Sequence, residues 1–148
     1  MTGPTVQPVP RTIHEDIRVV EHFLQAVEAD DFDTIEYLSA DELEWLIAGM
    51  TTVRGKDRVM KVLRSGEGKF RTELKTHRVT AADGSVLMER TDAWIIGRLR
   101  IVLWVYGVFE VRDGKVTLWR DYFDYLALAR ATARGLVGLV FPFVVKKL

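Results

Sequence analysis

The spacing of the apolar residues changes near Gly66, from every third or fourth residue before it to every second residue after it. The first spacing is typical of an amphipathic helix, and the second is typical of a β-strand with one buried face. Strands are expected at 69–80, 85–96, 99–111 and 115–124. The short turn sequences ADGS, GR and RDGK separate them, and such turns join antiparallel neighbours. The second half of the chain is therefore expected to form an antiparallel meander.

Three helices are expected before this change. The first begins at a T-x-x-E capping box, from Thr12 to Glu15, and continues through apolar residues spaced three and four apart. Asp31 can cap a short second helix, a third is expected over 56–66, and a short strand over 42–49 lies between them. Helices followed by a meander predict an α+β fold. We expect a curved antiparallel sheet that wraps around the helices as a cone and encloses a deep apolar pocket.

Length and composition favour one globular domain. The chain has 148 residues, and we assign 13–148 to a single domain that follows a flexible arm at 1–12. This arm is rich in proline and lacks an apolar run, which argues against a signal peptide. The longest apolar run, 136–145, is too short for a membrane span and contains Pro142. We therefore expect a cytoplasmic protein.

Charge and cysteine content exclude several classes of function. Lysine plus arginine and aspartate plus glutamate number 21 each, so no overall field would attract nucleic acid or an anionic membrane. The absence of cysteine excludes disulfides, thiolate metal sites and a cysteine nucleophile. His14, His22 and His77 are too dispersed to predict a metal site.

The strand VLMERTDAWII places charges where apolar side chains are expected. Val86, Met88 and Trp94 share one face of this strand. Because side chains two residues apart share a face, Arg90 and Asp92 lie on that apolar face too. Burying a charge costs several kcal/mol unless it is paired and hydrogen-bonded. The pattern therefore predicts a buried ion pair.

The strand TLWRDYFDY repeats this pattern. Its Asp121 shares a face with Trp119 and Phe123. If the sheet brings the two strands together, the forked donors of Arg90 can bridge Asp92 and Asp121.

Such a triad has two interpretations. Two carboxylates in a dry pocket resist full ionisation, so that one becomes an acid and the other a base, and together they can open a strained ring in one concerted step. Alternatively, the triad is a buried ion-pair network that keeps two strands in register, and the protein is a non-catalytic small-molecule-binding module. Sequence spacing leaves both interpretations open.

The segments ERTDAW and LWRDYFD resemble the limonene-1,2-epoxide hydrolase family, which has the NTF2-like (SnoaL-like) cone fold. The resemblance runs from residue 13 to about residue 140. It implies that Asp121 is the general base that deprotonates water, that Asp92 is the general acid that protonates the epoxide oxygen, and that Arg90 bridges the two. It implies a small apolar epoxide as the substrate, no cofactor, no covalent intermediate and a homodimer.

One part of the family's pattern is absent, the Tyr-x-Asn pair on the first strand that holds the attacking water. A count back from the RG dipeptide places Trp45 and Ile47 there, and a count forward from Asp41 places Glu44 and Leu46 there. Neither count restores the pair, and a misplaced nucleophile can lower a rate by about 10²-fold. Three interpretations follow: slow hydrolysis, an epoxide cyclase that uses a hydroxyl of its substrate, or a water site altered by engineering.

The substrate pocket is expected to be lined by apolar side chains of the strands, namely Trp45, Ile47, Met88, Trp94, Leu103, Val105, Trp119 and Phe123. Trp94 and Trp119 share strand faces with the acids, whereas Met88, Leu103 and Val105 either line the pocket or fill the core. The apolar C-terminal tail is expected to cover the pocket or to form a dimer contact.

Overall fold

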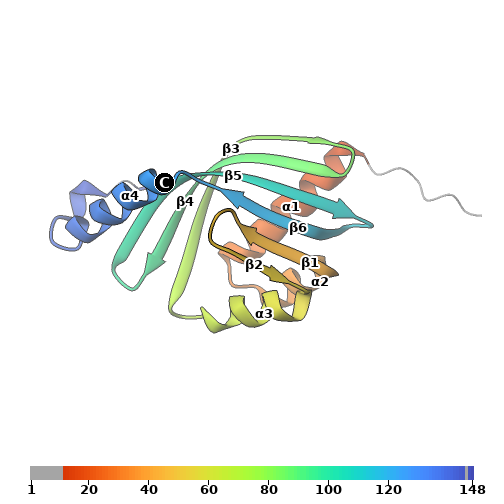
Figure 1. The fold of residues 1–148 in the computed structure, drawn as a ribbon, viewed down its shortest axis with the longest axis horizontal. Helices are drawn as coiled ribbons and strands as arrows, with labels where there is room; N and C mark the ends of the chain where they lie inside the picture. Colours follow the sequence, from red (N-terminus) through yellow and green to blue (C-terminus); the bar gives the residue numbers. More distant parts are fainter. Residues whose placement is uncertain (1–11, 146) are drawn as a thin grey trace, which may run out of the picture.

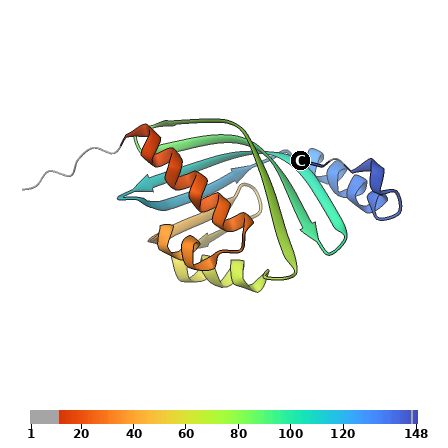
Figure 2. The same ribbon diagram turned by 180° about the vertical axis from the view of Figure 1, so that it is seen from behind.

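In residues 12–145 and 147–148, which the computed structural model describes, a curved six-stranded sheet packs against three helices, and a fourth helix extends from its far end (Figures 1 and 2). The arm expected at 1–12 lies outside these residues apart from Thr12. The helices are α1 (Ile13–Glu28), α2 (Phe32–Leu38), α3 (Lys56–Ser65) and α4 (Tyr125–Gly138), with a 3-10 turn at Pro142–Val144. The strands are β1 (Ser39–Ile47), β2 (Thr51–Arg54), β3 (Phe70–Ala82), β4 (Ser85–Ile96), β5 (Leu99–Arg112) and β6 (Lys115–Tyr122).

The α+β cone is confirmed, but the sheet is mixed rather than wholly antiparallel. Its order is β2-β1-β6-β5-β4-β3, and β1 pairs with β6 in parallel. Such a pair needs a long connection, and the chain supplies one by passing through α3 and four further strands before β6. The short strand β2, which was not among the expected strands, pairs with β1.

Local signals in the sequence explain most element boundaries. Thr12 and Glu15 form the capping box of α1, and the side chain of Asp31 accepts a hydrogen bond from the backbone of α2. At the β5–β6 turn, Asp113 and Gly114 both have positive φ, the conformation that two-residue hairpins of this type require. These boundaries therefore follow from short-range chemistry.

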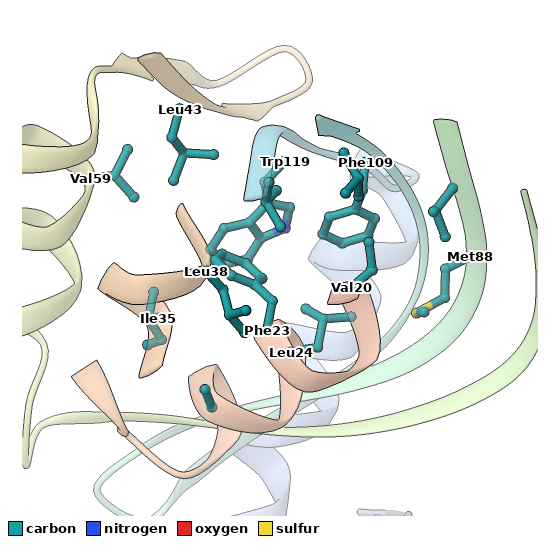
Figure 3. Packing of buried hydrophobic residues seen from close by; sticks show 14 of the residues in the cluster. Val20, Phe23, Leu24, Ile35, Leu38, Leu43, Val59, Met88, Phe109 and Trp119 are labelled. Carbon is teal, nitrogen blue, oxygen red and sulfur yellow. The ribbon is translucent and has the colours of Figure 1, made fainter. Parts of the chain in front are cut away.

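The main core lies between the helices and the concave face of the sheet (Figure 3). Phe23 of α1 meets the ring of Trp119 edge-on, while Leu43 of β1 packs near Val59 of α3. A smaller cluster forms where α4 packs against β5, around Leu103. None of the described helices is long and apolar enough to cross a membrane.

Candidate active site

Three charged side chains meet inside the cone. Arg90 donates from Nε to Oδ1 of Asp92 at 2.8 Å and from Nη2 to Oδ2 of the same residue at 3.1 Å. Its Nη2 also donates to Oδ1 of Asp121 at 2.7 Å. The three residues expose only 1%, 3% and 8% of their surface, for Arg90, Asp92 and Asp121 respectively. The structure thus brings together the triad that the two strand patterns predicted.

Sheet geometry explains this meeting. Arg90 and Asp92 lie on β4, where they pair with Val105 and Leu103 of β5, and Asp121 lies on β6 beyond β5. The Arg90 side chain therefore crosses the face of β5 to reach Asp121. An arginine suits this task because its guanidinium can donate to two carboxylates at once.

Trp119 adds a hydrogen bond that the strand patterns did not predict. Its Nε1 donates to Oδ2 of Asp121 at 2.8 Å, so each oxygen of this carboxylate has a donor. Trp119 was expected only as an apolar wall residue. The i, i+2 spacing of Trp119 and Asp121 on one strand was the signal available, since it places both side chains on one face.

The triad lies in the wall of a cavity of about 350 Å³ that is otherwise mostly apolar. Five of the eight expected lining residues do line it: Trp45, Ile47, Trp94, Trp119 and Phe123. Met88 lies in the main core instead, and Leu103 and Val105 lie in the smaller cluster under α4. These three residues therefore fill the interior beside the cavity rather than lining it.

The helices contribute wall residues that were not singled out from the sequence. They include Leu24 and Val27 of α1, Phe32 and Ile35 of α2, and Val62 and Leu63 of α3. The apolar stripes of these helices predicted that they face inward, but not that they face a cavity rather than packed core. Two polar residues, Asp30 and Thr72, also line the cavity.

The wall beside Asp121 is apolar. In the parallel pairing of β1 with β6, Ile47 lies opposite Asp121 and Trp45 lies opposite Trp119. The two tryptophan rings stack, with centroids 4.8 Å apart and planes 17° apart. Glu44 instead binds Arg54 on β2. Of the two counts along β1, the structure therefore supports the one that places Trp45 and Ile47 beside Asp121 and its neighbour Trp119.

Burial controls the proton affinity of the triad. Burial raises the pKa of Asp92 to about 6 and also raises the pKa of Asp121, although the positive charge of Arg90 opposes both changes. Burial also disfavours the charged form of Arg90, but the two carboxylates outweigh it and raise the pKa of the guanidinium. Because one cation faces two carboxylates, the triad readily binds a proton.

This shift predicts that Asp92 makes stability depend on pH. Its pKa is about 6 in the folded protein and about 4 when unfolded, so the folded state holds the proton more tightly. The stabilisation is present below pH 4 and is lost as the pH rises through 6, by up to about 3 kcal/mol. Urea unfolding between pH 4 and 7 will measure it, with Asp92→Asn as the comparison. Equal pH slopes in the two proteins would contradict the prediction.

The site offers no set of metal ligands. No group of three or more histidine, aspartate or glutamate residues that could hold a metal ion occurs within residues 12–145 and 147–148. The polar groups that are hydrogen-bonded to one another at the site are the two carboxyls, the guanidinium and the Trp119 indole. This arrangement suits proton transfer to and from a bound apolar molecule.

Comparisons with known proteins identify the family of this chain. A family model described as the limonene-1,2-epoxide hydrolase catalytic domain matches residues 14–134. The chain is 48% identical, over 123 residues and 83% of each chain, to Epoxide hydrolase EphG from Mycobacterium tuberculosis. It is also similar to the solved structure of an M. tuberculosis LEH-like epoxide hydrolase, at 45% identity and a TM-score of 0.91, covering 95% of this chain and 100% of that one.

A more distant solved structure shares the fold. It is an NTF2-like protein from Burkholderia xenovorans, with a TM-score of 0.69 and 25% identity, covering 83% of this chain and 99% of that one. The cone is thus the NTF2-like fold.

Proposed function

This chain belongs to the limonene-1,2-epoxide hydrolase family and is an epoxide hydrolase, and we propose that it opens a small apolar epoxide with one carboxyl group as acid and the other as base. The observation that carries the proposal is the buried triad of Arg90, Asp92 and Asp121 in the wall of an apolar cavity.

In the proposed reaction, Asp121 removes a proton from water as the water oxygen attacks one carbon of the epoxide. Asp92 gives its proton to the epoxide oxygen as the carbon–oxygen bond breaks, and the product is a diol. The two donors on Asp121, from Arg90 and Trp119, favour its ionised form and so its role as base. The raised pKa of Asp92 favours the protonated form that an acid needs. After the reaction, one proton must pass from Asp121 to Asp92, directly or through solvent.

The cavity favours an apolar substrate. Trp94 of β4 meets Phe123 edge-on in its wall, with ring centroids 5.5 Å apart. Burying an apolar molecule against such walls is favourable, at about 25 cal/mol per Å² removed from water. The few polar groups of the site then orient the epoxide toward the two carboxyls.

A second candidate function is epoxide cyclisation, and the apolar wall beside Asp121 supports it. Opposite Asp121, Ile47 offers a water no hydrogen bond, and Trp45 offers only its indole N–H, which has no partner among the described residues. A hydroxyl within the substrate is held in place by the rest of the bound molecule, so it needs fewer hydrogen bonds to attack well. Deprotonation of that hydroxyl by Asp121 would then yield a cyclic ether.

One experiment separates the two reactions. An apolar epoxy-alcohol is incubated with the enzyme in water enriched in heavy oxygen, and the products are analysed by mass spectrometry. A labelled diol supports hydrolysis, and an unlabelled cyclic ether supports cyclisation. Asp121→Asn serves as the control for uncatalysed opening. If folded enzyme forms neither product from a panel of apolar epoxides, the proposal fails and a binding module is favoured.

A further inference from the structure

Gly107 lies in the middle of β5, where a glycine is unexpected. A glycine inside a strand weakens it, because it adds backbone entropy to the unfolded chain and offers no side chain to pack. The φ of Gly107 lies outside the left-handed region, so its backbone conformation does not require glycine. Some other feature of the site must explain this residue.

The position of Gly107 in the sheet supplies an explanation. It pairs with Met88 of β4 on one side and with Asp121 of β6 on the other. Arg90 lies on β4, and neighbouring strands are about 4.8 Å apart, so its side chain spans about 10 Å to reach β6. It crosses β5 above Gly107.

Space above this glycine is already filled. A Cβ added to Gly107 would lie 2.4 Å from Nη1 of Arg90, 2.8 Å from Cε2 of Phe109 and 3.4 Å from Oδ1 of Asp121. The first two distances are shorter than real Cβ contacts. Nη1 has no hydrogen-bond partner among the described residues. The position of Nη1 is therefore determined by van der Waals packing against Gly107 and not by a hydrogen bond.

We propose that Gly107 is a positioning residue for catalysis: its missing side chain forms the slot through which the Arg90 guanidinium crosses β5 to bind Asp121. Val105 and Phe109, the neighbours of Gly107 on the same face of β5, are both fully buried and bound the slot along the strand. The kinetic part of this inference rests on the proposed acid and base roles of the triad, whereas the slot itself is a property of the fold.

A methyl group in the slot must move either Arg90 or Phe109. Arg90 is held by Asp92 through two hydrogen bonds and by Asp121 through one, so the weaker attachment to Asp121 is expected to break. Asp121 then keeps Trp119 as its remaining donor, and the pKa of its carboxyl rises further because an opposite charge is lost. Asp92 keeps Arg90 and still faces Glu28 of α1.

The test is Gly107→Ala, measured by steady-state kinetics on an apolar epoxide and by carbon-13 NMR titration of the Asp121 carboxyl. We expect kcat to fall by about 10²-fold with a small change in KM. The pKa of Asp121 should rise, and the acidic limb of the kcat/KM profile should move to higher pH by the same amount. The NMR titration needs no substrate, so it tests the slot even if the proposed function is wrong.

Two further variants separate positioning from folding. Val111→Ala removes core packing from the same strand, away from the triad, and should lower the Tm without shifting the pKa of Asp121. Phe109→Leu combined with Gly107→Ala relieves the second steric conflict and leaves the conflict with Arg90. The proposal is overturned if Gly107→Ala keeps native kcat and Asp121 pKa, or if it behaves like Val111→Ala. Failure of both glycine variants to fold also overturns it, because the glycine would then serve folding rather than positioning.

Discussion

Asp121→Asn is expected to lower kcat by about 10³-fold or more while the fold survives, because general acid–base groups contribute about 10²–10⁴-fold each. Asparagine has the same shape as aspartate, and its side-chain oxygen can still accept a hydrogen bond from Arg90 or Trp119. It cannot accept a proton from the nucleophile, however. Asp92→Asn is expected to have a loss of similar size, because an amide cannot protonate the epoxide oxygen. Initial rates on an apolar epoxide, with Tm measured for each variant, will test both.

Asp124→Asn is the matched control for these two variants. Asp124 follows the same strand but caps α4, where its Oδ1 accepts hydrogen bonds from the backbone of Leu126 and Ala127. Asparagine caps helices about as well as aspartate, so activity and Tm should both stay near native values. Substantial turnover in either Asp121→Asn or Asp92→Asn would contradict the assigned roles. Loss of folding in both, without any epoxide turnover by the native protein, would favour a structural ion-pair network.

Arg90→Met is expected to destabilise the protein at pH 7 by about 3–5 kcal/mol, the usual cost of leaving buried charges without their partner. Methionine fills a similar length of space but leaves Asp92 and Asp121 buried without a cation. The folded-state pKa of each carboxyl then rises further above its unfolded value. The resulting stabilisation by bound protons is present at low pH and lost as the pH rises. The deficit relative to the native protein should therefore be smaller at pH 5 than at pH 7, as urea unfolding at both values will measure.

A triple variant provides the control for this cost. Arg90→Met combined with Asp92→Asn and Asp121→Asn removes all three charges and should recover part of the lost stability. It should remain inactive, because it lacks both carboxyl groups of the proposed mechanism. The contrary result is that Arg90→Met alone unfolds at the same urea concentration as the native protein at both pH values. In that case the buried carboxylates do not depend on the guanidinium, and the electrostatic account of the site is wrong.

Alternation along two strands was sufficient to predict the triad. Side chains alternate between the two faces of a strand, so every second residue of β4 faces the interior if one of them does. The structure shows this for four buried residues, Val86, Met88, Arg90 and Asp92. The short turns around Asp113 and Asp83 likewise determined which strands are neighbours. These features depend on residues close together in the chain, and local sterics and hydrogen bonding decide them.

Pairing between distant segments decided the rest of the site. The β1–β6 pair is parallel, so no hairpin turn in the sequence marks its register, and only the folded sheet places Ile47 beside Asp121. A count from the ADGS turn puts Glu73 opposite Trp94, whereas a bulge between Thr76 and Arg78 puts Thr72 there and on the cavity wall. A one-residue shift of this kind reverses which side chains face inward.

The sequence by itself determined the α+β architecture, the strand faces and the two carboxylates with their arginine, because each follows from local periodicity. Only the tertiary structure decided that Trp119 donates a hydrogen bond to Asp121 and that Leu103 and Val105 pack under α4. It also decided that Gly107 leaves room for the Arg90 side chain to cross β5. These contacts depend on sheet curvature, on strand register and on which helix covers each part of the sheet. Long-range packing sets all three, and periodicity along one strand does not encode them.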